Sequence, residues 1–211
     1  MLNPVACQQL ISTQGERIRW LEALPCDCRD PGDPDYGDHR GCAKCQYGYV
    51  YRERVLGPDV RAMVTQVRRE FIHRELGFLQ VGELLITTMA EEIPLGNWDR
   101  VVLVERAMPK KEIVRFGDDE LAEDFPTAVL SVADADTEFV QAHDYRFDDV
   151  GGKIVWLGQR TPAGSIYTVH YYYAPVYWYV GAPMQTARPI RGRAMRMPQS
   201  GKLEIKHPVE G

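Results

Sequence analysis

The chain has 211 residues, enough for one well-buried domain or for a domain with a small appendage. Hydrophobic residues make up 45% and charged residues 26%, the balance of an ordinary globular protein, and no apolar run approaches the length of a membrane span, so we expect no membrane partner. The formal net charge is −5. An acidic chain argues against a dedicated surface for duplex nucleic acid, which needs clustered Lys and Arg.

Residues 1–25 predict a helical segment. Asn3 is a suitable N-cap and Pro4 a suitable first helical residue. Apolar residues then recur at roughly helical spacing between Leu10 and Leu24, with Gly15 as a candidate break. Pro25 ends the segment.

Residues 26–46 predict a metal module. Cys26-Asp27-Cys28 is followed after thirteen residues by Cys42-Ala43-Lys44-Cys45. Two close cysteine pairs joined by a loop can bring four thiolates to one tetrahedral centre, an arrangement that suits Zn²⁺. We therefore expect a structural Zn²⁺ held by Cys26, Cys28, Cys42 and Cys45, with no vacant position for catalysis, and with His39 as an alternative ligand.

The alternative is a pair of disulfides. Cysteines two residues apart do not easily bond to each other, so an oxidised form needs cross-pairing between the two halves. The first five residues lack the basic and apolar regions of a signal peptide, which leads us to expect a reducing cytosol and hence metal. The loop between the pairs carries Asp30, Asp33, Asp35 and Asp38, but their spacing does not fit an EF-hand, and a solvated loop is preferred to a calcium site.

Residues 47–180 predict a β domain. The hydrophobic pattern changes to period two, broken by turns rich in Gly, Pro and Asn, which is typical of an antiparallel barrel or sandwich in a mainly β protein. The expected strands are 47–55, 61–69, 78–88, 100–105, 111–116, 127–132, 138–141, 145–147, 153–157 and 165–180.

The last expected strand is rich in aromatic residues. Seven Tyr and Trp side chains lie between Tyr167 and Tyr179, and stacking on single-stranded bases is one interpretation. Such a platform needs interleaved Lys and Arg, and residues 166–180 contain none. We therefore expect these rings to be core residues and anchors of a subunit interface.

Residues 181–211 predict an extended basic C-terminal arm. Six basic and two acidic residues give residues 185–211 a local charge of +4, so the other 184 residues carry −9. With few large apolar residues, this segment cannot bury enough surface to offset the entropy of ordering. We expect it to become ordered against a neighbouring acidic subunit, although contact with nucleic acid is an alternative.

No catalytic constellation is apparent, and we expect no enzymatic activity. His143 and Asp144 form a tempting dyad, but neighbours on a strand point to opposite faces. The acidic group Asp118-Asp119-Glu120 is more typical of an exposed turn than of a cation site. Cys7 is a lone thiol in an apolar segment, which is more typical of a buried structural cysteine than of a nucleophile.

Two parts of the chain resemble virion structural proteins of tailed bacteriophages. One is the run His143-Asp144-Tyr145-Arg146-Phe147, Gly152-Lys153-Ile154-Val155-Trp156, Thr161-Pro162-Ala163-Gly164-Ser165-Ile166-Tyr167-Thr168-Val169-His170-Tyr171 and Ala174-Pro175-Val176-Tyr177. The other is the cysteine module with Gly48-Tyr49-Val50-Tyr51-Arg52, which is similar to a short metal module of some phage neck and head–tail connector proteins. Together these parts cover about residues 20–56 and 140–180.

The resemblance implies a non-enzymatic ring protein (collar or adaptor) in the neck of the virion. Its partners would be further copies of itself, portal or adaptor proteins, tail proteins, and genomic DNA that passes through the bore without sequence-specific contact. It would be made in the cytoplasm of a bacterial host. An acidic lumen suits this role because DNA then slides without sticking. A tail or baseplate structural protein and a zinc-ribbon nucleic-acid-binding protein are the alternatives.

Overall fold

The computed structural model describes residues 4–28, 42–45, 48–53, 60–66, 84–88, 96, 98–158, 166–180 and 199–205. The chain forms two compact units, and each is described by itself. Unit 1 contains the described residues up to Leu103 together with those from Tyr177 onward, and unit 2 contains Val104–Val176. Unit 2 is therefore inserted between two strands of unit 1.

The expected helical segment over residues 1–25 is only half correct. Helix α1 spans Pro4–Gln14, and strand β1 spans Glu16–Pro25. The helix stops just before Gly15, whose amide donates to the Ile11 carbonyl at 2.8 Å. A side chain at Gly15 would collide with the backbone of Ile11 and Ala62. Beyond Gly15, the buried Ile18 and Trp20 alternate with exposed arginines, so the true period is two.

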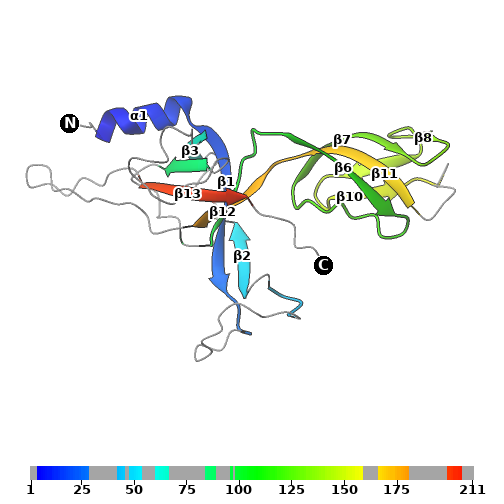
Figure 1. Ribbon diagram of the computed structural model, residues 1–211, viewed down its shortest axis with the longest axis horizontal. Helices are drawn as coiled ribbons and strands as arrows, with labels where there is room; N and C mark the ends of the chain where they lie inside the picture. Colours follow the sequence, from blue (N-terminus) through cyan, green and yellow to red (C-terminus); the bar gives the residue numbers. More distant parts are fainter. Residues whose placement is uncertain are drawn as a thin grey trace, which may run out of the picture. The chain divides into compact units, whose positions relative to one another are not determined.

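Unit 1 is a closed, six-stranded antiparallel β-barrel (Figure 1). The order around the barrel begins and ends at β1, which pairs with β3 on one side and β5 on the other. The other strands, in spatial order, are β3 (Val60–Gln66), β4 (Leu84–Thr88), β13 (Gln199–Ile205), β12 (Val176–Val180) and β5 (Arg100–Val102). A seventh strand, β2 (Tyr49–Glu53), pairs with the end of β1 that extends past the barrel.

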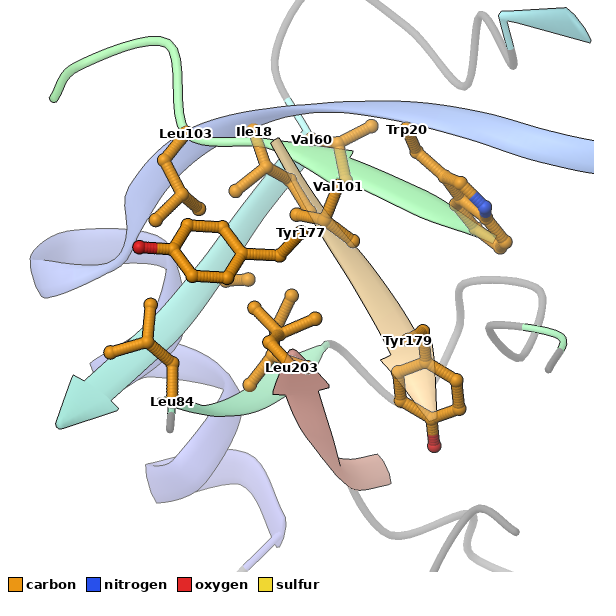
Figure 2. Packing of buried hydrophobic residues seen from close by; sticks show 11 residues of the cluster. Ile18, Trp20, Val60, Leu84, Val101, Leu103, Tyr177, Tyr179 and Leu203 are labelled. Atoms are coloured by element: carbon orange, nitrogen blue, oxygen red, sulfur yellow. The ribbon is translucent and has the colours of Figure 1, made fainter. Parts of the chain in front are cut away.

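Alternating side chains from all six barrel strands fill the interior of unit 1. Figure 2 shows the ring of Tyr177 between the side chains of Leu103 and Leu84, with Leu203 close by. Leu203 and Val101 have no exposed surface, and Trp20 and Tyr179 have 2% and 1%. The buried cluster comprises Ile18, Trp20, Val60, Ala62, Leu84, Ile86, Val101, Leu103, Tyr177, Tyr179 and Leu203.

Unit 2 has two layers. A four-stranded sheet in the order β6-β11-β7-β8 packs against a two-stranded hairpin of β9 and β10. The shared core includes Val169 and Tyr171 from the sheet and Tyr145 and Ile154 from the hairpin. The strands are β6 (Met108–Arg115), β7 (Pro126–Ala133), β8 (Glu138–Phe139), β9 (Tyr145–Asp148), β10 (Lys153–Trp156) and β11 (Ile166–Tyr173).

The mainly β fold and the barrel are confirmed, and each of the ten expected strands overlaps an observed one. The segment 165–180 is two strands, β11 and β12, separated by Ala174-Pro175, because proline cannot donate to a ladder. The prediction of an extended C-terminal arm is wrong for residues 199–205, which form the barrel strand β13 between β4 and β12. The rest of the expected arm lies outside the described residues.

Candidate metal centre

The antiparallel pairing of β1 and β2 brings the two cysteine pairs together. Residues 21–25 pair with residues 49–53, with Pro25 opposite Tyr49. Cys26 and Cys28 directly follow β1, and Cys42 and Cys45 precede β2. The Cys26 amide donates to the Gly48 carbonyl at 2.9 Å, which extends the pairing into the module. We call residues 21–28, 42–45 and 48–53 the cysteine ribbon; its strands project from the barrel in Figure 1.

The four predicted sulfur atoms lie close enough to bind one metal ion. All four lie within 4.8 Å of one another, and Cys28 Sγ is 3.4 Å from Cys45 Sγ. Tetrahedral coordination with metal–sulfur bonds of about 2.3 Å places sulfurs about 3.8 Å apart, so the cluster has the right size. All five cysteines of the chain are free thiols, and the two-disulfide alternative is not the arrangement observed.

The four thiols differ in their exposure to solvent, and Cys28, Cys42 and Cys45 differ in their pKa values. Cys26 is buried, Cys42 and Cys45 are half-buried, and Cys28 is exposed. A hydrogen bond from the Lys44 amide lowers the pKa of the Cys42 thiol to about 7. Hydrogen bonding to Cys26 raises the pKa of Cys28, and burial raises that of Cys45. A metal ion would replace the remaining protons, because the thiolate is the form that binds metal.

A buried carboxylate that the sequence did not reveal holds the base of the cysteine ribbon. Asp99 is 3% exposed and accepts hydrogen bonds from the Trp20 indole at 2.8 Å, the Ala23 amide at 2.8 Å and the Gly96 amide at 2.7 Å. Burial raises the pKa of Asp99 above its usual value. The bond to Ala23 fixes β1 three residues before Cys26. Because 79 residues separate Asp99 from Trp20, no local pattern could have predicted this contact.

A second contact joins the barrel to the other strand of the ribbon. The guanidinium carbon of Arg100 lies 3.7 Å from the centre of the Tyr51 ring, a cation–π arrangement between β5 and β2. Arg100 is 4% exposed. Asp99 and Arg100 are adjacent in the chain, and they thus hold β1 and β2 at the end of the barrel from which the ribbon projects.

The expectation that His143 and Asp144 point apart was wrong. Both lie in a turn before β9 rather than on a strand, and His143 Nδ1 is 2.7 Å from Asp144 Oδ1. The other oxygen of Asp144 accepts from the Val140 amide at 2.9 Å. Asp144 has no exposed surface, whereas His143 is exposed. Both carboxylate oxygens are therefore used in closing this turn.

The acidic group 118–120 lies beside β10 in unit 2. Asp119 Oδ1 accepts hydrogen bonds from the Tyr167 hydroxyl at 2.7 Å and the Trp156 indole at 3.1 Å, whereas Asp118 and Glu120 are exposed. Cys7 lies half-buried in α1 and is not part of the cysteine cluster. His39 and the acidic loop with Asp30, Asp33, Asp35 and Asp38 lie outside the described residues.

The aromatic stretch divides between the two cores. Tyr167 and Tyr171 are buried in unit 2, and Tyr177 and Tyr179 in unit 1, as expected of core residues. Their expected role at a subunit interface stays a prediction.

No protein-family model matches the chain, and no curated protein sequence matches it. In the described ranges, none of the helical residues form a helix with the length and hydropathy needed to cross a bilayer.

Proposed function

We propose that this chain is a non-enzymatic structural protein of a tailed-phage virion, a ring-forming component of the neck that joins portal and tail. A Zn²⁺ ion bound by Cys26, Cys28, Cys42 and Cys45 stabilises its cysteine ribbon. The observation that carries the proposal is the cluster of four sulfurs within 4.8 Å at the end of a ribbon that leaves the barrel. It has the ligand set of a structural zinc site.

The cysteine ribbon needs a metal because it has little core of its own. None of the five residues of β2 is buried, and the same holds for residues 21–25 of β1. An isolated two-stranded ribbon is marginally stable in water. The free energy of binding a four-thiolate metal therefore becomes the folding energy of the ribbon. A stiffened projection of this kind suits contact with a neighbouring subunit better than catalysis.

Three further features support a role in a virion neck. The cysteine module and the hairpin residues between His143 and Tyr177 resemble neck and connector proteins. The chain consists of two small β units, each with its own buried cluster, which suits a modular building block. Its net charge of −5 suits a ring through which DNA passes without adhering. Its partners are then copies of itself, the portal or an adaptor, and tail proteins.

Metal analysis tests the zinc site. Protein purified under reducing conditions is expected to carry about one equivalent of zinc, as one four-ligand site requires. Cys42→Ser removes a ligand and should release the ion, whereas Cys7→Ser, outside the cluster, should retain it. A wild-type protein whose cysteine ribbon is fully folded without bound metal would contradict the assignment of a structural zinc site.

Deletion of the gene from its phage or prophage tests the function. We expect DNA-filled heads and free tails that fail to join, with rescue by the wild-type gene supplied in trans. Normal heads with defective tails would favour the tail or baseplate alternative. Particles of normal form and infectivity would overturn the virion role, and binding of oligonucleotides by the purified protein would then favour the nucleic-acid alternative.

A further inference from the structure

Unit 2 presents two outer surfaces of opposite character. The first lies on the four-stranded sheet, on the side away from the hairpin. In the register of β6 and β11, Ile113 lies opposite Thr168, Lys111 opposite His170 and Arg115 opposite Ile166. The alternate residues of the same strands, such as Val114 and Tyr167, lie in the core with β9 and β10. We call the residues Lys111, Ile113, Arg115, Ile166, Thr168, His170 and Tyr172 the sheet face.

The sheet face combines exposed aliphatic groups with positive charge. Ile113 is 71% exposed and Ile166 is 54% exposed. Lys111 and Arg115 flank Ile113 at two residues on either side, so all three project from the same side of β6. Neither cation forms an ion pair with any residue in the described part of the chain. The seven residues of the sheet face include no carboxylate.

The second surface is an acidic groove beside the hairpin. Two backbone hydrogen bonds join the turn after β6 to β10 and to the residue before it: the Ile154 amide donates to the Asp119 carbonyl at 3.0 Å, and the Leu121 amide donates to the Gly152 carbonyl at 2.9 Å. The turn and β10 enclose an open groove of about 400 Å³. Its lining consists of Gly117, Asp118, Asp119, Glu120, Lys153, Ile154, Val155 and Trp156.

The acidic groove has the complementary composition. Three carboxylates outnumber the one lysine, and Val155 and Trp156 provide apolar surface. The hydrogen bonds from Tyr167 and Trp156 hold the Asp119 carboxylate in place, so this part of the groove is formed before any partner arrives.

We infer that the sheet face of one copy docks on the acidic groove of a second copy. In this arrangement Ile113 packs on Val155 and Trp156, and Lys111 and Arg115 face the carboxylates of the groove. The inference rests on the proposed ring and names its interface. Two different surfaces that bind each other form a heterologous contact, which repeats from copy to copy and closes as a ring when the rotation allows. Complementary charge also sets the orientation of the contact.

A nucleic acid is a poorer occupant of the sheet face. Two flanking cations neutralise few phosphates, and nucleic-acid binding depends on many such contacts. The exposed Ile113 and Ile166 have no counterpart in a phosphate backbone. A second copy, in contrast, offers both apolar and acidic groups in one groove.

A charge-swap experiment on the full chain with its metal tests the inference. One variant carries Lys111→Glu and Arg115→Glu, and the other carries Asp118→Lys and Glu120→Lys. Each variant alone brings like charges together, so we expect its self-association, measured by analytical ultracentrifugation, to be at least tenfold weaker than that of the wild type. Mixing the two variants pairs opposite charges at both types of contact and should restore association. Asp136→Lys with Glu138→Lys is the matched control, because these exposed residues do not line the groove.

Each outcome separates this interface from the proposed function. Loss of association in each variant and recovery in the mixture, with unchanged circular dichroism, supports the interface. Association that persists in both variants overturns it and leaves the ring to another surface. A wild-type protein that is monomeric at every concentration also overturns the interface, while the gene deletion decides the virion role independently. Retention of single-stranded DNA by the wild type but not by the Lys111→Glu/Arg115→Glu variant would assign the sheet face to nucleic acid instead.

Discussion

Asp99→Ala should loosen both the barrel and the base of the cysteine ribbon. The substitution removes the acceptor of the Trp20 indole, the Ala23 amide and the Gly96 amide. Gly96 is exposed, so its amide can turn to water, but Trp20 is only 2% exposed and its indole N–H loses its partner inside the protein. The main cost therefore comes from Trp20 and Ala23.

The magnitude follows from these two hydrogen bonds. A hydrogen bond to a charged acceptor contributes about 1.5–3 kcal/mol. Part of this gain is offset by the cost of burying the carboxylate, since burial raises the pKa of Asp99. We expect a net loss of about 3 kcal/mol in the free energy of unfolding, roughly a 150-fold change in the equilibrium constant.

Urea unfolding and NMR measure this effect. The midpoint of the unfolding transition should fall, and the indole proton of Trp20 should shift and exchange faster with solvent. Asp149→Ala is the control, because Asp149 is an exposed acid in a turn and its removal should change stability by less than about 0.5 kcal/mol. If Asp99→Ala were no more destabilising than Asp149→Ala, the assignment of Asp99 as the group that holds the ribbon would be refuted.

Three further predictions concern the barrel, the ribbon and unit 2. Gly201→Ala places a methyl group within the ring of the buried Tyr179, so we expect a loss of about 3 kcal/mol or more in urea unfolding, partly recovered by Tyr179→Leu. Chelation of the metal should speed hydrogen exchange in residues 49–53 but not in the barrel strand β4, which exchange mass spectrometry can resolve. Burial raises the pKa values of Tyr167 and Tyr171. The stability that these phenols contribute is present below about pH 10 and is lost as the pH rises toward their pKa values in the folded state. Absorbance at about 295 nm should therefore show the two tyrosines ionising only as unit 2 unfolds.

Features with a local signal in the sequence could be predicted. The ten expected strands rest on period-two patterns between turns, and each overlaps an observed strand. The four cysteines could be assigned to one cluster because two short pairs need only one hairpin to meet. The identity of the metal and the virion role remain proposals, because they depend on partners that a chain's own contacts do not contain.

Features that depend on distant contacts could not be predicted in the same way. Residues 16–24 contain Ile18, Leu21 and Leu24, which fit a helical stripe, while the buried pair Ile18 and Trp20 fits a strand equally well. The neighbouring strands β3 and β5 decide between the two, because they pair with β1 on both sides. Asp99 is similar, since its role depends on an indole that is 79 residues away.

The C-terminal segment shows how composition can hide a structural strand. Its positive charge and few apolar residues predicted an arm, yet β13 supplies the fully buried Leu203 and pairs with both β4 and β12. One inward leucine and one glycine beneath Tyr179 are enough for a barrel strand whose other face is polar. A chain that ends at Val180 therefore lacks one of six barrel strands and exposes the edges of two others.

We expect truncation after Val180 to abolish the cooperative unfolding of unit 1 and to promote aggregation through the open strand edges. Unit 2 should keep its fold, because all of its strands lie between Met108 and Tyr173. Removal of residues 207–211 is the control, since β13 ends at Ile205 and the barrel should keep its wild-type unfolding midpoint. Hydrogen exchange by mass spectrometry distinguishes the units: protection should vanish in β3 and β4 and persist in β11. A truncated chain that stays monomeric with wild-type protection in β4 would show that the barrel closes without β13.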